Sequence, residues 1–234
     1  MKSPIRCATL ARNHEGETLL ENQLRYVAVE GPLGVGKTTL ARRLAKSLKA
    51  DLILENPADN PFLEDFYRQP EHMALPAQLH FLMSRRKALK DLAANVSESS
   101  CRVSDFLFQK DRLFAGLTLN SKQLELYQSL SQELEFDLLV PDLVVYLQAP
   151  LDVLYDRIEK RAIPSEQAIA SSYVARLQKA YTEMFHNYND TPLLIVNATD
   201  INFAQNEQDY AGLLRQIKTV QAGRHYFNPA PEVA

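Results

Sequence analysis

The feature that most constrains this chain is a glycine-rich segment at residues 31–39, with the sequence GPLGVGKTT. It fits the pattern G-x-x-x-x-G-K-[ST] in full. It follows an apolar, β-branched run at 26–30 and precedes an amphipathic pattern in which Leu40, Leu44 and Leu48 recur. A loop between a buried strand and a helix turns backbone N–H groups and the positive end of the helix dipole toward one point. The segment therefore predicts a binding site for the phosphates of a nucleoside triphosphate.

The residue types of this loop predict separate tasks. Lys37 would reach the β- and γ-phosphates, and Thr38 would coordinate Mg²⁺. A GTPase would also need Asn-Lys-x-Asp for its base. The nearest string, at 197–200, is Asn-Ala-Thr-Asp and lacks the lysine, which counts against a GTPase. The nucleotide-binding positions that we predict are Gly31, Pro32, Leu33, Gly34, Val35, Gly36, Lys37, Thr38 and Thr39.

The rest of the chain alternates between strand and helix patterns, which predicts one α/β domain with a five-stranded parallel sheet covered by helices. We expect this domain at 25–222, after a loosely attached extension at 1–24 and before a C-terminal tail at 223–234. The predicted strands are 26–30, 51–55, 101–105, 142–147 and 193–196. One predicted helix follows residue 39 and another follows Pro76. The other predicted helices occupy 62–69, 111–135 in two pieces, 151–161, 166–189 and 206–221.

Composition narrows the function classes. Hydrophobic residues make up 46% of the 234 and charged residues 24%, which is typical of a globular protein. The formal net charge of -3 gives no reason to expect a nucleic-acid or membrane partner. The chain has no apolar run of the roughly 18 residues that a membrane helix needs, and no secretory signal pattern. Its two cysteines form no zinc motif, so we expect a cytoplasmic protein.

Several further strings resemble the deoxynucleoside kinase family, which includes deoxyadenosine, deoxyguanosine and deoxycytidine kinases. They follow one another in the family's order and spacing from about residue 26 to about residue 200. The matching strings are LENP at 54–57, DNPFLEDFY at 59–67, QLHFLMSR at 78–85, SD at 104–105, KDRLFA at 110–115, DLVVYLQA at 142–149 and RIEKR at 157–161.

The resemblance implies a P-loop NTPase fold with a short lid. It also implies transfer of the γ-phosphoryl group of ATP to the 5′-hydroxyl of a small-molecule deoxynucleoside, with Mg²⁺. Glu55, which follows the second predicted strand, would be the general base. With it, Lys37, Arg157 and Arg161 would be catalytic, and Thr38 and Asp105 would hold the metal.

The resemblance also assigns the acceptor site. Tyr67 and Glu166 would hold the 3′-hydroxyl, and the amide of Gln78 would pair with the base edge, because an amide offers both a donor and an acceptor. The remaining substrate residues are Arg85 and Asp111, which would face the base, and Phe81 and Phe108, which would line it.

Two positions depart from the family pattern. Phe106 follows Asp105 where the family usually has arginine, and Ile163 stands where the lid usually has a second arginine. Each lost cation would weaken the stabilisation of the transferring phosphoryl group. Lys110 and Arg112 are the cations that could compensate.

Two rival functions therefore stay open. A nucleoside monophosphate kinase shares the loop and the sheet, and a nucleotide-binding protein derived from a kinase would fit the missing arginines. The string at 59–62 is most similar to bacterial members, which favours purine deoxynucleosides. Family members commonly form dimers through helices near 120–140, a segment rich in leucine and acidic residues here, so the resemblance implies a homodimer.

Overall fold

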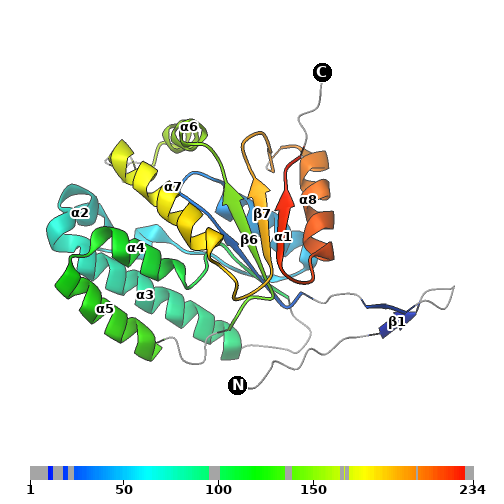
Figure 1. Cartoon of the computed structure of the whole chain (residues 1–234), viewed down its shortest axis with the longest axis horizontal. Helices are drawn as coiled ribbons and strands as arrows, with labels where there is room; N and C mark the ends of the chain where they lie inside the picture. The colour runs from blue at the N-terminus through cyan, green and yellow to red at the C-terminus, as the bar shows by residue number, and fades with distance from the viewer. Residues whose placement is uncertain are drawn as a thin grey trace.

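The computed structural model describes residues 10–12, 18–20, 24–94, 101–134, 139–163, 166, 169–203 and 205–229. Its centre is a parallel sheet of six strands in the order β4-β5-β3-β6-β7-β8 (Figure 1). From β3 the chain first builds one side of the sheet and then the other, so the loop after β3 lies at a topological switch point. The strands are β3 (Tyr26–Glu30), β4 (Asp51–Ile53), β5 (Arg102–Ser104), β6 (Leu143–Gln148), β7 (Leu193–Asn197) and β8 (Arg224–Phe227).

The prediction of five strands was wrong by one, because β8 lies in the segment that we assigned to the tail. β8 pairs in parallel with β7, with Leu193 opposite Arg224 and Val196 opposite Phe227. Its sequence, RHYF, has no apolar run and no fully buried residue. An edge strand with one neighbour needs no apolar run and no fully buried residue, so the hydrophobic pattern of the sequence did not indicate β8.

Helices cover both faces of the sheet. They are α1 (Lys37–Leu48), α2 (Leu63–Arg68), α3 (Pro70–Ala94), α4 (Lys110–Thr118), α5 (Ser121–Leu134), α6 (Leu151–Arg161), α7 (Ser171–His186) and α8 (Glu207–Thr219). Figure 1 shows α3, α4, α5 and α7 on one side of the sheet and α8 on the other.

Alternate side chains of the central strand β3 enter two separate cores. Val27 and Val29 pack with residues of α1 and α8, and Ala28 packs with residues of α3, α4 and α7. All three valine and alanine side chains are fully buried. A strand covered on both faces is apolar along most of its length, as the run at 26–30 indicated up to its last residue.

Two helices begin several residues away from their predicted starts. α3 begins at Pro70 and includes Pro76, whereas we expected the helix to follow Pro76. Proline suits the first turn of a helix, where its missing N–H group needs no partner, which explains Pro70. Pro76 lies inside the helix, where it removes one backbone hydrogen bond without ending the helix. α7 begins at Ser171 rather than at 166. Residues 164, 165, 167 and 168 of the expected lid lie outside the described residues.

Within the N-terminal extension, β1 (Leu10–Arg12) and β2 (Thr18–Leu20) pair as an antiparallel hairpin. The remaining residues of the expected extension, and residues 230–234 of the expected tail, lie outside the described part of the chain. Among the residues that the structure describes, no helix has the length and apolar character that crossing a membrane requires.

Candidate active site

The glycine-rich loop joins β3 to α1 and adopts a conformation that only glycine allows at several positions. Gly31, Gly34 and Gly36 have φ angles of 152°, 81° and 104°. A Cβ atom on Gly31 would lie 2.4 Å from the carbonyl oxygen of Leu147, and one on Gly34 would lie 2.9 Å from that of Leu154. The loop therefore packs directly on the backbone of β6 and α6, as the motif requires.

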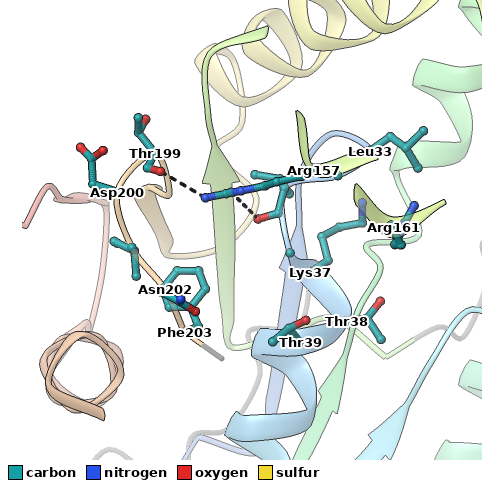
Figure 2. Close-up of a pocket in the computed structure, with 14 residues that line it drawn as sticks. Leu33, Lys37, Thr38, Thr39, Arg157, Arg161, Thr199, Asp200, Asn202 and Phe203 are labelled. Carbon is teal, nitrogen blue, oxygen red and sulfur yellow. Dashed lines mark hydrogen bonds between the residues drawn. The ribbon is translucent and has the colours of Figure 1, made fainter. Parts of the chain in front are cut away.

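The loop opens onto a cavity of about 420 Å³. All of the predicted nucleotide-binding positions from Leu33 to Thr39 line this cavity, together with Arg157, Arg161 and the segment 199–203 (Figure 2). A volume in this range is typical of sites for small molecules and cofactors. The structure thus brings the loop and both predicted arginines of α6 to one cavity. The other two predicted positions, Gly31 and Pro32, are not among the residues that line the cavity, but their carbonyl groups contact Lys37.

Lys37 lies at the start of α1 with its ammonium group held inside the loop. Its Nζ atom donates to the carbonyl oxygens of Gly31 at 2.8 Å and Pro32 at 3.2 Å. Burial lowers the pKa of Lys37 to about 8, against the attraction of Glu30 and other nearby carboxylates. An ammonium group that is poorly solvated gains most from a phosphate, because no water must be removed from it.

Thr38 and Asp105, the two predicted metal residues, are in direct contact. The Thr38 hydroxyl donates to Oδ2 of Asp105 at 2.6 Å. These oxygens suit Mg²⁺, which is usually bound through one or two carboxylates together with substrate phosphates and water. The described residues contain no group of three or more His, Cys, Asp or Glu side chains that could hold a metal alone. The pair therefore fits a magnesium ion that arrives with its nucleotide.

The backbone links this pair to the predicted general base. Oδ1 of Asp105 accepts a hydrogen bond from the backbone N–H of Glu55 at 2.8 Å. Glu55 follows β4 after Ile53 and Leu54, so β4 is two residues shorter than the predicted strand. The carboxyl ends of β4 and β5 therefore bring Glu55 and Asp105 together at the edge of the sheet where the loop lies.

Two cations hold the side chain of Glu55. Arg85 donates from Nε to Oε1 at 2.6 Å, and Lys110 donates from Nζ to Oε2 at 2.8 Å. Burial alone would raise the pKa of Glu55, but Arg85 and Lys110 outweigh it and hold that pKa at about 2. Glu55 is consequently ionised at neutral pH and able to accept a proton.

Among the predicted base-facing residues, Arg85 contacts Glu55 directly. Arg85 is buried and forms an ion pair with buried Asp111, and its guanidinium carbon lies 4.9 Å from the centre of the Phe81 ring. Gln78 is only 3% exposed, and its Oε1 atom has no hydrogen-bond partner among the described residues. A buried amide oxygen without a partner is costly unless a ligand satisfies it. Gln78 therefore fits a residue that pairs with a base.

The predicted sugar-binding residues lie close to one another. Burial raises the pKa of Tyr67 well above its ordinary value, and the negative charges of Glu166 and Glu55 raise it further. Glu166 forms an ion pair with Arg161. Arg161, the last residue of α6, is thus paired with Glu166. Tyr67 lies near enough to Glu166 and Glu55 for their charges to raise its pKa.

Arg157 points from α6 across the mouth of the cavity toward the segment after β7 (Figure 2). It donates to the carbonyl oxygens of Ala198 at 2.8 Å and Thr199 at 3.1 Å, and also contacts that of Val35 at 3.5 Å. Burial lowers its pKa, partly offset by Asp200. Arg157 therefore joins the glycine-rich loop to the far wall of the same cavity.

Phe108 and Phe106 lie together in the apolar core between the sheet and α3, α4 and α7. Phe108 is 6% exposed and Phe106 is 1% exposed. Phe108 thus packs in this core, and its contact with a base stays a prediction. Phe106 fills with an aromatic ring the position where the family usually has an arginine.

Glu30 is a buried carboxylate beside the glycine-rich loop that was not among the predicted site residues. It is fully buried and accepts hydrogen bonds from the backbone of Gly31 and Leu107 and from the hydroxyl of Tyr181. Its position gave a signal, because a charged residue ends the otherwise apolar run at 26–30. Its contacts fix the first turn of the loop against β5 and α7.

The chain is similar to known proteins in its sequence. The family model for deoxynucleoside kinase matches residues 27–221. The deoxyguanosine kinase of Bacillus subtilis strain 168 is 31% identical over 84% of this chain and 98% of its own. The deoxyadenosine/deoxycytidine kinase of the same strain is 28% identical over 83% and 92%.

A solved structure shows the same fold. It is the deoxyadenosine kinase from M. mycoides with the products dCMP and a flexible dCDP bound, and it matches with a TM-score of 0.73 at 23% identity. The match covers 83% of this chain and all of that one. The extent of the family match, and the identity to the Bacillus subtilis deoxyguanosine kinase over nearly its whole length, show that this chain belongs to the deoxynucleoside kinase family.

Proposed function

We propose that this protein transfers the γ-phosphoryl group of ATP to the 5′-hydroxyl of a deoxynucleoside, with Mg²⁺ bound by Thr38 and Asp105. The observation that carries the proposal is the network that joins Thr38, Asp105 and Glu55. It connects the phosphate-binding loop to an ionised carboxylate on the acceptor side of the sheet.

In this mechanism Lys37 and the backbone N–H groups of the loop bind the β- and γ-phosphates. Glu55 orients the 5′-hydroxyl and takes its proton as the oxygen attacks the γ-phosphorus, while ADP leaves. A pKa of about 2 makes Glu55 a weak base. Phosphoryl transfer tolerates a weak base, because its loose transition state depends mainly on positioning and on charge stabilisation. Arg157 and Arg161 of α6 supply positive charge at the same cavity.

The charges around Glu55 favour a nucleoside over a nucleoside monophosphate as acceptor. Arg85 is already paired with Glu55 and Asp111, and Lys110 is paired with Glu55. A monophosphate placed there would face two carboxylates whose neighbouring cations are already engaged. A hydroxyl group has no such charge, so Glu55 can accept its proton without repulsion.

The relatives support a purine deoxynucleoside as substrate, because each of the two Bacillus subtilis proteins is named for a purine deoxynucleoside, deoxyguanosine or deoxyadenosine, although one of them is also named for the pyrimidine deoxycytidine. A homodimer is supported by exposed apolar side chains on α3 and α5, namely Met83, Leu126 and Leu130. We place this protein in the cytoplasm, where ATP and deoxynucleosides are both available.

The decisive experiment incubates the protein and Mg-ATP with deoxyadenosine, deoxyguanosine, deoxycytidine, thymidine and each of their monophosphates. A 5′-monophosphate formed from a purine deoxynucleoside, and lost in Glu55→Gln, is the expected result. A diphosphate formed only from a monophosphate would favour the monophosphate kinase. ATP binding without any product would favour the binding protein.

A further inference from the structure

Lys110 is the one buried lysine on the acceptor side of the site among the residues that the structure describes, and the family pattern assigns it no task. It is the first residue of α4 and only 2% exposed. Its Nζ atom lies 2.8 Å from Oε2 of Glu55 and 3.9 Å from Oε2 of Glu30. An ammonium group is costly to bury and is retained where carboxylates compensate it.

The charges nearby explain why a second cation is needed. Arg85 is shared between two carboxylates, Glu55 and Asp111. Glu30 is fully buried next to them. Without Lys110, one guanidinium group would have to balance both Glu55 and Asp111, and Oε2 of Glu55 would lose its partner. Lys110 thus supplies positive charge that no other described residue offers to this oxygen.

Position 106, which Phe106 occupies, is the place where the family pattern would put a cation instead of Lys110. Phe106 directly follows Asp105 at the end of β5, and its ring has no group that can bind a carboxylate. Nζ of Lys110 lies 6.0 Å from the centre of that ring. A long basic side chain at 106 would therefore lie near the position that the ammonium group of Lys110 occupies.

We propose that Lys110 is a positioning residue for phosphoryl transfer, which holds one oxygen of Glu55 while Arg85 holds the other. The carboxylate is thereby fixed at both oxygens beside the phosphate-binding loop, and Lys110 takes over from α4 the task that an arginine at 106 would perform. This inference rests on the proposed function, because it assumes that Glu55 orients the acceptor hydroxyl.

The test compares steady-state kinetics of Lys110→Met, Lys110→Arg and the double variant Phe106→Arg/Lys110→Met with the wild-type protein. Lys110→Met should lower kcat by about 10²-fold, the usual effect of removing one preorganised donor, with little change in KM for ATP or deoxynucleoside. Lys110→Arg should retain most of the activity. The double variant should recover at least about tenfold of the loss, since an arginine at 106 restores the missing charge.

Lys179→Met is the matched control, because Lys179 is an exposed lysine on α7. Thermal unfolding of every variant separates a folding defect from a kinetic one. If Lys110→Met does not fold, Lys110→Gln keeps a donor without the charge, and kcat should then fall in the order Lys, Arg, Gln at nearly constant KM.

Three results would overturn the inference. One is an unchanged kcat in folded Lys110→Met, and another is a loss that appears equally in kcat and in nucleotide binding. The third is a folded double variant with no recovery, which would overturn the claim that Lys110 performs the task of an arginine at 106. A wild-type protein that phosphorylates no deoxynucleoside would overturn the proposed function as well, so the two failures are distinguishable.

Discussion

The hydroxyl of Thr38 donates a hydrogen bond to Asp105, with 2.6 Å between Oγ1 and Oδ2. This contact joins the first turn of α1 to the end of β5. Through its other oxygen, Asp105 accepts the backbone N–H of Glu55. The candidate metal site and the candidate base are consequently coupled by one carboxylate, and a change at Asp105 should affect both.

Asp105→Asn should weaken the use of Mg²⁺, because the amide keeps the shape of the side chain but loses its charge. We expect the Mg²⁺ concentration for half-maximal activity to rise by about 10- to 100-fold, the usual effect of altering a residue that supports a metal site. Titration of activity with Mg²⁺ at saturating ATP measures this shift. Thr38→Ser, which keeps the hydroxyl, is the control and should stay close to wild type. An unchanged Mg²⁺ requirement in Asp105→Asn would contradict the assignment.

Two glycines of the loop should differ in their effect on stability. Gly31→Ala places a Cβ atom 2.4 Å from the carbonyl oxygen of Leu147, whereas nothing lies within 4 Å of the corresponding position on Gly36. Gly31→Ala must therefore displace the backbone of β6 and should cost about 2–3 kcal/mol. Gly36→Ala should cost about 1 kcal/mol, from its positive φ angle alone. Urea unfolding of both variants checks the order, and equal losses would contradict it.

Much of the fold could be predicted because its central strands are apolar along most of their length. Val27, Val29 and Val145 are fully buried, and runs of this kind identify strands covered on both faces. β8 gave no such signal, because an edge strand can be polar. Pro76 misled the helix boundary, because proline usually begins or breaks a helix, whereas here it lies inside α3.

Motifs and a family resemblance predicted the residues of the candidate site. They could not predict the contacts between these residues. Glu55, Asp105 and Thr38 were each predicted separately, and the structure places them in one network. Lys110 was named only as a cation that could compensate, since its contact with Glu55 spans 55 positions of sequence. Such a contact depends on how α4 packs against the end of β4, which no local pattern encodes.

Gln78→Leu should impair binding of the deoxynucleoside without destabilising the fold. The buried Oε1 atom of Gln78 has no partner among the described residues, so its removal costs the folded protein little. Loss of its hydrogen bonds to a base should raise KM for the deoxynucleoside by about tenfold or more, while KM for ATP stays constant. Gln78→Asn, which shortens the amide, should give an intermediate KM. A change in KM for ATP alone would contradict the placement of the base at Gln78.

Acid should remove the stabilisation that Glu55 receives from its two cations. Burial opposes ionisation, but Arg85 and Lys110 lower the pKa of Glu55 from an ordinary value of 4.5 to about 2. Folding therefore favours the carboxylate, and its contribution is complete above pH 4.5 and is lost as the pH falls toward 2. Each pKa unit corresponds to about 1.4 kcal/mol, so the contribution is of the order of 3 kcal/mol.

Glu55→Gln has no carboxylate to titrate, so it should be less stable than wild type at neutral pH, and the difference should shrink on acidification. Urea unfolding of both proteins across this pH range measures the difference directly. Glu64→Gln, which removes a carboxylate from the exposed surface of α2, is the matched control. A wild-type advantage that stays constant down to pH 2 would show that Glu55 is not held as a carboxylate by Arg85 and Lys110. Such a result would also contradict the proposal that Arg85 and Lys110 hold the Glu55 carboxylate in place to orient the acceptor hydroxyl.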